Sequence, residues 1–140
     1  MDDRELIRLA MEARMRSYSP YSGFSVGAAL LTGDGRVYLG CNIENAAYSP
    51  TVCAERVAFF KAISDGARDF SAIAIVGAPR GEEARSACPP CGVCRQVMAE
   101  HCEPDAFRIV LAEGDGTRAV LLRELYPEAF YPERVKEECK

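Results

Sequence analysis

The chain has 140 residues, 49% hydrophobic and 27% charged, so it can bury a core of its own without disulfide bonds. Its formal net charge of −4 leaves no basic surface for the phosphates of a nucleic-acid polymer. The acidic first residues lead into no long apolar run, so we expect no signal peptide, no membrane span and a cytoplasmic location.

The apolar patterns alternate between helical and extended segments along the chain. In order, they predict a helix, two strands, a helix, a strand, a helix and two strands, at residues 4–16, 24–31, 36–41, 52–65, 70–78, 91–101, 107–112 and 117–122. Asp2 or Asp3 can cap the first helix. Thr32-Gly-Asp-Gly35 is typical of a hairpin, and Gly66 is expected to end the second helix. We expect residues 1–140 to form a single α/β domain, a three-layer α/β/α sandwich on a mixed central sheet.

Seven cysteines and a single histidine limit the metal sites that the chain can build. In a reducing compartment, clustered cysteines are more often metal ligands or catalytic groups than disulfides. Cys53 is followed by the carboxylate of Glu55, and Cys91 and Cys94 stand three residues apart. Three thiolates leave the fourth position of a tetrahedral zinc open to water, and a nearby carboxylate can move protons there. The pattern therefore favours a hydrolytic zinc enzyme.

The three thiols are expected at helix starts, where the helix dipole favours thiolates. Cys91 and Cys94 would share one face of a first turn, whereas Glu55 does not share the helix face of Cys53. Glu55 is therefore expected to reach the water and not to ligate the metal.

Three thiolates on one zinc leave a net negative charge. Arg56 is the expected cation to offset it, through a hydrogen bond to a sulfur. Arg95 and Gln96 are further candidates for supporting the thiolates.

Cys88 leaves a second kind of site open. With the other three thiols it could close a four-thiolate zinc site or hold an iron–sulfur cluster. Because Cys88 precedes two prolines in the irregular loop at residues 79–90, outside the helix start, we favour the open site. The remaining cysteines are expected to be core or surface thiols: Cys41, Cys102 and Cys139. His101 is expected to do no more than favour the dipole at a helix end.

Four motifs follow one another along the chain: Phe24-x-Val-Gly-Ala-Ala29, Cys41-Asn-Ile-Glu-Asn-Ala46, Cys53-Ala-Glu-Arg56 and Pro90-Cys-Gly-x-Cys-Arg-Gln96. Together they resemble the small, homotetrameric cytidine deaminases, from the first helix to about Phe130. The resemblance implies zinc-dependent hydrolysis of cytidine and 2′-deoxycytidine to uridine and 2′-deoxyuridine, with release of ammonia, in pyrimidine salvage. It also implies one zinc per subunit, a free nucleoside as substrate, and a homotetramer with sites at subunit interfaces.

The resemblance further implies roles for single residues. Zinc would be held by Cys53, Cys91 and Cys94. Glu55 would take a proton from the water and deliver protons to N3 and to the departing amine. Substrate contacts would come from backbone groups of Ala54 at the pyrimidine edge, Asn42 and Glu44 at the ribose 3′-hydroxyl, Phe24 against the nucleoside, and Tyr48 and Phe130 from neighbouring subunits.

Three alternatives remain at this point. A related zinc enzyme deaminates the antibiotic blasticidin S, although the Cys53-Ala-Glu-Arg56 segment and the Asn42/Glu44 pair favour cytidine. A non-catalytic zinc module would have its site closed by Cys88. An editor of RNA or DNA is disfavoured by the acidic charge balance. The chain also departs from the family pattern in a longer loop before Pro90 and in Cys88-Pro89, which replaces a small polar residue.

Overall fold

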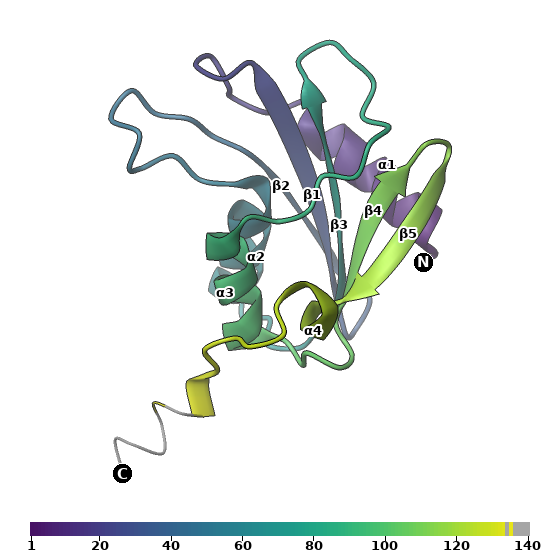
Figure 1. Ribbon diagram of the computed structural model, residues 1–140, viewed down its shortest axis with the longest axis vertical. Coiled ribbons are helices and arrows are strands. Elements are labelled where there is room, and N and C mark those ends of the chain that lie inside the picture. The colour runs from purple at the N-terminus through teal and green to yellow at the C-terminus, as the bar shows by residue number, and fades with distance from the viewer. Residues whose placement is uncertain (134, 136–140) are drawn as a thin grey trace.

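Five strands form one mixed sheet in the computed structural model, which describes residues 1–133 and 135 (Figure 1). The elements in chain order are α1 (Asp3–Arg14), β1 (Phe24–Thr32), β2 (Val37–Cys41), α2 (Ala54–Ser64), β3 (Phe70–Pro79), α3 (Gly92–His101), β4 (Arg108–Glu113), β5 (Gly116–Leu121) and α4 (Leu122–Leu125). The predicted α/β class is therefore confirmed. Within the described residues, no helix combines the length and apolar character needed to cross a bilayer.

The strands are ordered β2-β1-β3-β4-β5 across the sheet. Only β3 and β4 run parallel, because α3 lies between them in the chain and carries it back across the sheet. The other neighbouring pairs are antiparallel, and β1 and β2 form the predicted hairpin with Gly27 opposite Cys41. This connectivity makes the sheet mixed, as expected.

Helices cover both faces of the sheet (Figure 1). Helix α1 approaches one face so closely that a Cβ on Gly27 would lie 2.0 Å from the Ala10 carbonyl oxygen. Helix α2 approaches the other face, where a Cβ on Gly40 would lie 2.3 Å from the Ala54 carbonyl oxygen. Glycine at these two positions allows the helices to pack directly on the strands. The predicted three-layer α/β/α arrangement is confirmed.

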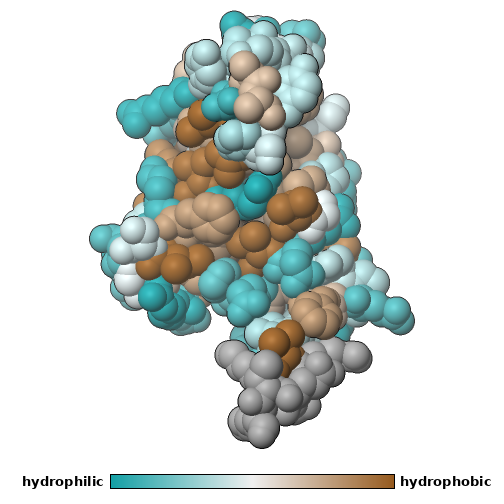
Figure 2. Space-filling view, turned by 90° about the vertical axis from the view of Figure 1, so that its left-hand side faces the viewer, coloured by the Kyte–Doolittle hydropathy of each residue, from teal (hydrophilic) through white to brown (hydrophobic). Residues whose placement is uncertain are grey.

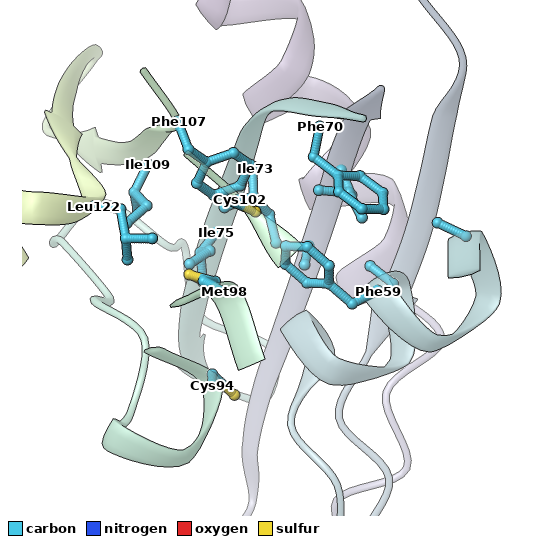
Figure 3. Close-up of a cluster of buried hydrophobic side chains, with 14 of the residues drawn as sticks. Phe59, Phe70, Ile73, Ile75, Cys94, Met98, Cys102, Phe107, Ile109 and Leu122 are labelled. Atoms are coloured by element: carbon cyan, nitrogen blue, oxygen red, sulfur yellow. The ribbon is translucent and has the colours of Figure 1, made fainter. Parts of the chain in front are cut away.

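The larger apolar cluster fills the space between the sheet and helices α2 and α3 (Figure 3). Its largest fully buried side chains include Phe59 from α2, Met98 from α3, Ile73 and Ile75 from β3, and Phe107 just before β4. Cys94 lies at the edge of this cluster and belongs to it. The cluster therefore fixes how α2 and α3 lie relative to each other.

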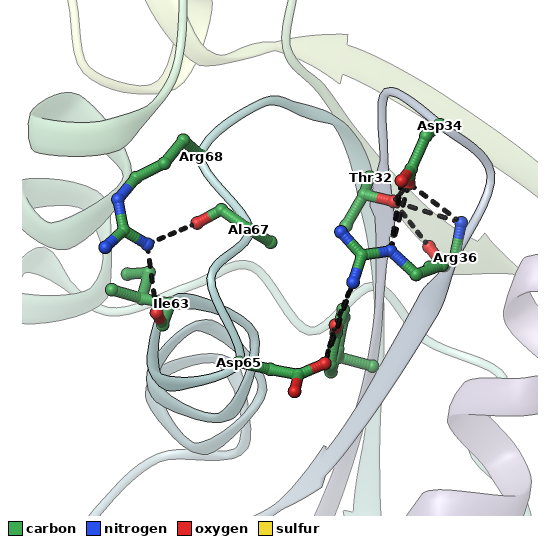
Figure 4. Close-up of polar contacts among 8 residues, drawn as sticks. Thr32, Asp34, Arg36, Ile63, Asp65, Ala67 and Arg68 are labelled. Carbon is green, nitrogen blue, oxygen red and sulfur yellow. Dashed lines mark hydrogen bonds and ion pairs between the residues drawn. The ribbon is translucent and has the colours of Figure 1, made fainter.

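A polar network ties the end of α2 to the β1–β2 hairpin (Figure 4). The Tyr38 hydroxyl donates to the Asp65 carboxylate, and Arg36 Nη1 lies 3.6 Å from Asp65 Oδ2. Within the turn, the Arg36 backbone N–H donates to Thr32 Oγ1 at 3.0 Å. Arg68 donates to the carbonyl of Ile63 in the last turn of α2, at 2.9 Å, and to that of Ala67 after the helix, at 2.8 Å. These exposed contacts are individually weak, but they act together on one end of α2.

The predicted boundaries are wrong by one or two residues at several element ends. Helix α2 begins at Ala54, two residues later than expected, because Val52 pairs with Ile43 through two backbone hydrogen bonds of 3.0 Å. Helix α1 is capped by Asp2, whose side chain accepts from the Glu5 N–H. Gly66 ends α2 with a φ of 95°, as expected. Helix α4 is an element that the sequence patterns did not predict.

Arg14 attaches the long loop after β3 to the rest of the molecule. Although charged, its side chain is buried, and its guanidinium donates to four backbone carbonyls. Nε donates to Ser25 at 3.0 Å and Nη1 to Glu82 at 2.9 Å, while Nη2 donates to Ala78 and Pro79 at 3.0 and 2.9 Å. The apolar pattern did not single out Arg14, although it lies four residues after Ala10 and eight after Leu6, on the buried face of α1.

Replacing Arg14 with alanine should lower the free energy of unfolding by about 3 kcal/mol, because it leaves buried carbonyls without donors. Arg14→Lys should lose less, since the ammonium can still donate to some of them. The exposed Arg8→Ala variant is the control and should change stability by less than about 0.5 kcal/mol. Chemical denaturation at one protein concentration measures all three, and equal stabilities for Arg14→Ala and Arg8→Ala would contradict the assignment.

Candidate metal centre

Three cysteines meet where α2 and α3 begin. Cys53 is the N-cap of α2 and Cys91 the N-cap of α3, both with extended backbone, and Cys94 lies in the first turn of α3. Their sulfur atoms all lie within 4.8 Å of one another, and the Sγ atoms of Cys53 and Cys91 are 3.7 Å apart. Neither N-cap sulfur is used in a capping hydrogen bond. The donor set therefore fits a thiophilic ion such as zinc.

The surroundings of Cys53 favour the thiolate. The pKa of Cys53 is lowered to about 5, first by a hydrogen bond from the Cys94 thiol and also by Arg56 and Cys91. Arg56 Nη2 donates to Cys53 Sγ at 3.4 Å. Hydrogen bonding to Cys53 raises the pKa of Cys94, since that thiol supplies the proton. A single negative charge is thus already stabilised among the three sulfurs.

Glu55 is buried beside this cluster. It lies in the first turn of α2 and is only 4% exposed. Burial raises the pKa of its carboxyl to about 7, the negative charge of Cys53 adds to the rise, and a hydrogen bond with Cys94 opposes it. Glu55 is not part of the group of mutually close ligand atoms. The carboxyl can therefore exchange protons near neutral pH beside the cluster.

Cys88 does not join the cluster. Its sulfur lies against β3, 2.7 Å from where a Cβ on Gly77 would be, and an atom of the Phe24 ring lies 2.9 Å from the same point. Burial raises the pKa of the Cys88 thiol to about 11, and the charges of Glu55 and Cys53 contribute. Cys88 thus lies beside Phe24 and Gly77 as a neutral thiol, and the structure does not support a site closed by a fourth sulfur.

The remaining cysteines are separate from the cluster. Cys102 is buried in the core and Cys41 is half-buried, as expected for core and surface thiols. Cys139 lies outside the described residues. His101 lies in the last turn of α3, as expected, with its ring 6.4 Å from that of Phe59.

Arg95 and Gln96 contact the segment that follows β5. Arg95 Nε donates to the Pro90 carbonyl at 2.8 Å, and its Nη1 donates to the Leu125 carbonyl at 2.5 Å. Gln96 Nε2 donates to the Phe130 carbonyl, and Gln96 Oε1 accepts from the Tyr126 hydroxyl, both at 2.7 Å. Both of these Gln96 contacts go to the C-terminal segment, so the structure offers no support for Gln96 as a partner of the thiolates. Of the candidates, Arg56 is the one hydrogen-bonded to a sulfur.

Asn42, Glu44 and Phe24 lie together near the cluster. The Asn42 amide binds the start of β1, with Nδ2 donating to the Phe24 carbonyl at 2.8 Å and Oδ1 accepting from the Val26 N–H at 2.9 Å. The Glu44 carboxylate accepts from the N–H groups of residues 21 and 22 and from the Ser22 hydroxyl, which lowers its pKa. The paired backbones of residues 43 and 52 hold this segment beside Cys53.

Tyr48 and Phe130 are exposed aromatic side chains. Tyr48 is 75% exposed, with a φ of 60° that non-glycine residues rarely adopt. Phe130 is 58% exposed, and its own carbonyl accepts the hydrogen bond from Gln96. Figure 2 shows apolar surface gathered on the face that carries α2 and α3, where Phe60 and Val93 are also exposed. Neither Tyr48 nor Phe130 is buried by its own chain.

Replacement of Cys91 should abolish metal binding, whereas replacement of Cys88 should not affect it. Cys91→Ser removes one of three clustered donors and is expected to lose bound zinc, whereas Cys88→Ser should keep the zinc content of the unsubstituted protein. Elemental analysis of the purified proteins gives the zinc content per subunit, with Cys41→Ser as a matched control. Loss of zinc from Cys88→Ser would show that the site is closed by four sulfurs.

The chain is similar to known proteins in both sequence and structure. Residues 1–109 match the family model described as the cytidine and deoxycytidylate deaminase zinc-binding region. A cytidine deaminase of Halalkalibacterium halodurans is 49% identical over 134 residues, covering 95% of this chain and 97% of that protein. One of Sporosarcina psychrophila is 57% identical over 102 residues, covering 73% and 71%. The crystal structure of a cytidine deaminase from Burkholderia pseudomallei matches with a TM-score of 0.83 and 46% identity, covering 93% of this chain and all of that one.

Proposed function

The chain belongs to the cytidine deaminase family of hydrolases, and we propose that it converts cytidine and 2′-deoxycytidine to uridine and 2′-deoxyuridine, with release of ammonia. The observation that carries the proposal is the buried carboxyl of Glu55 beside the cluster of Cys53, Cys91 and Cys94. Hydrolytic deamination needs both an activated water and a group that moves protons, and this arrangement can provide both.

The three clustered cysteines would hold one zinc ion per subunit. Zinc bound by three thiolates keeps one position open, where it acts as a Lewis acid and lowers the pKa of water. Arg56 would offset part of the net negative charge through its hydrogen bond to Cys53.

Glu55 would carry the protons. With its pKa of about 7, the carboxylate would take one proton from the water that attacks C4 and pass it to N3. It would then take the second proton from the new C4 hydroxyl and pass it to the amine, which leaves as ammonia while the C4 carbonyl forms. Burial also keeps the carboxyl in one position, because it is enclosed at the start of α2. One group can thus serve as base and as acid in successive steps.

The substrate would be a free nucleoside. Asn42 and Glu44 would bind the ribose 3′-hydroxyl, and Phe24, 39% exposed, would pack against the nucleoside. Ala54 is the first residue of α2, so its backbone N–H is free of intrahelical bonds and could reach the pyrimidine edge. Such an enzyme would return cytidine and deoxycytidine to the uridine pools, which is a role in pyrimidine salvage.

The assembly would be a homotetramer with its sites at subunit interfaces. Support comes from the exposure of Tyr48 and Phe130 and from the apolar surface over α2 and α3 (Figure 2). In such an assembly Tyr48 and Phe130 would complete the site of a neighbouring subunit. The six described cysteines are free thiols, which is consistent with a cytoplasmic enzyme.

Glu55→Gln and Glu55→Ala should keep the zinc content and lose deamination by about 10²–10⁴-fold or more, because the proton carrier is removed. The control is Glu100→Gln, an exposed carboxylate on α3, which should keep full activity. The absorbance change on conversion of cytidine measures turnover, with blasticidin S assayed in parallel. Unchanged turnover by Glu55→Gln, or faster turnover of blasticidin S than of cytidine by the unsubstituted protein, would contradict the proposal.

Phe130→Ala should raise KM for cytidine about tenfold, through loss of an aromatic contact to the substrate of another subunit. Mixing Phe130→Ala with inactive Glu55→Ala subunits tests the direction of this contact. In mixed tetramers, sites that combine Glu55 of one chain with Phe130 of its neighbour should regain the normal KM. If no mixture recovers it, Phe130 does not act across an interface.

A further inference from the structure

The hydrogen bonds of Asn42 leave one group of its side chain free. Oδ1 accepts from the Val26 N–H at 2.9 Å and from the Ser17 hydroxyl at 2.5 Å, which fills its acceptor capacity. Nδ2 donates one of its two hydrogens to the Phe24 carbonyl at 2.8 Å. One N–H therefore remains, and Asn42 can offer a ligand a donor but no acceptor.

Glu44 offers the complementary group. Its Oε1 accepts from the N–H groups of Tyr21 and Ser22 at 2.9 and 3.0 Å, and Oε2 accepts from the Ser22 hydroxyl. One acceptor position remains on Oε2. Asn42 and Glu44 are two residues apart in an extended segment, so their side chains project to the same side. One free donor beside one free acceptor matches a hydroxyl, which accepts and donates at once.

Ser17 also contacts Asn42, but it is not among the residues proposed above to bind the substrate. Its hydroxyl has a single hydrogen, and the contact of 2.5 Å with Asn42 Oδ1, an oxygen that can only accept, assigns the hydrogen to that bond. The Ser17 oxygen lies 3.2 Å from the hydroxyl of the buried Ser19, which in turn lies 3.3 Å from that of the buried Ser25. Ser19 Oγ and the Asn42 carbonyl oxygen are the other acceptors within reach of the Ser17 hydrogen, and at 3.2 and 3.4 Å both lie farther from Ser17 Oγ than Asn42 Oδ1 does.

We propose that Ser17 is a positioning residue that makes Asn42 a pure donor toward the ribose 3′-hydroxyl, and so gives the nucleoside a single bound orientation. The inference rests on the proposed function, in which Asn42 and Glu44 bind that hydroxyl. Without the Ser17 hydroxyl, one acceptor position of Asn42 opens. The 3′-hydroxyl could then donate to Asn42 or to Glu44, and the two orientations would compete.

The backbone around Ser17 does not depend on its side chain. The Tyr18 N–H donates to the Asn42 carbonyl at 3.0 Å, and the Glu44 N–H donates to the Tyr18 carbonyl at 2.8 Å. These bonds remain in a Ser17→Ala variant, which removes only the hydroxyl. Asn42 also keeps its two contacts to β1. The variant therefore separates the positioning role from folding of the loop.

The test compares 2′-deoxycytidine with 2′,3′-dideoxycytidine, which differ only in the 3′-hydroxyl. Ser17→Ala should raise KM for 2′-deoxycytidine about threefold to tenfold, with kcat within about twofold, and should leave kcat/KM for 2′,3′-dideoxycytidine unchanged. Ser17→Thr keeps the hydroxyl and should restore KM. The matched control is Ser64→Ala, a serine exposed at the end of α2, which should change neither substrate.

The outcomes separate the two proposals. Equal losses on both substrates, or no loss on either, in an otherwise active enzyme would overturn the role of Ser17 alone. An unsubstituted protein that turns over neither cytidine nor 2′-deoxycytidine would overturn the proposed function, and the role of Ser17 with it.

Discussion

The close approach of two helix N-termini on one face of the sheet is the constraint on which the site depends. Helices α2 and α3 pack on the same apolar cluster, so their first residues meet, with the sulfurs of Cys53 and Cys91 3.7 Å apart. Both N-caps are cysteines with extended backbone, and neither sulfur makes a capping hydrogen bond. Because the positive ends of two helix dipoles converge there, the position favours negative charge before any metal is considered. The direct contact of α2 with β2 at Gly40, and the polar network at the far end of α2, hold that helix in place.

The surroundings of each ionisable group near this point limit the repulsion between negative charges. Hydrogen bonds from Cys94 and Arg56 lower the pKa of Cys53, whereas burial raises that of Glu55. A carboxyl that titrates near neutrality beside a stabilised thiolate can hold or release a proton at little cost. Cys88, also near, is kept neutral by burial against β3, and its sulfur faces Phe24 and Gly77. The Cys88 thiol thus lies outside the group of three sulfurs that could hold a metal ion.

The C-terminal segment and the loop between β2 and α2 extend this centre in two directions. Arg95 and Gln96 follow Cys94 directly, and they bind the segment that carries Phe130. The backbone of residue 43 pairs with that of residue 52, which precedes Cys53 in the chain. This pairing holds Asn42 and Glu44, the neighbours of residue 43, close to Cys53. Two short stretches of backbone therefore connect the clustered cysteines with the residues that would bind the substrate. The same stretches present Tyr48 and Phe130 at the surface, where a neighbouring subunit could use them.

The sequence by itself determined the order of the five strands and three longer helices, the α/β class and the three thiols at helix starts, because apolar periodicity and cysteine spacing are local properties. It also placed Glu55 off the ligand face, since that follows from residue spacing on a helix. Only the tertiary structure decided which thiols come together, because Cys53 and Cys91 are 38 residues apart and meet through packing. It likewise separated Cys88 from the cluster, directed Gln96 to the C-terminal segment, and buried Arg14 and Glu55. Burial and hydrogen-bond partners depend on what the whole chain brings near a side chain, and no local pattern records that.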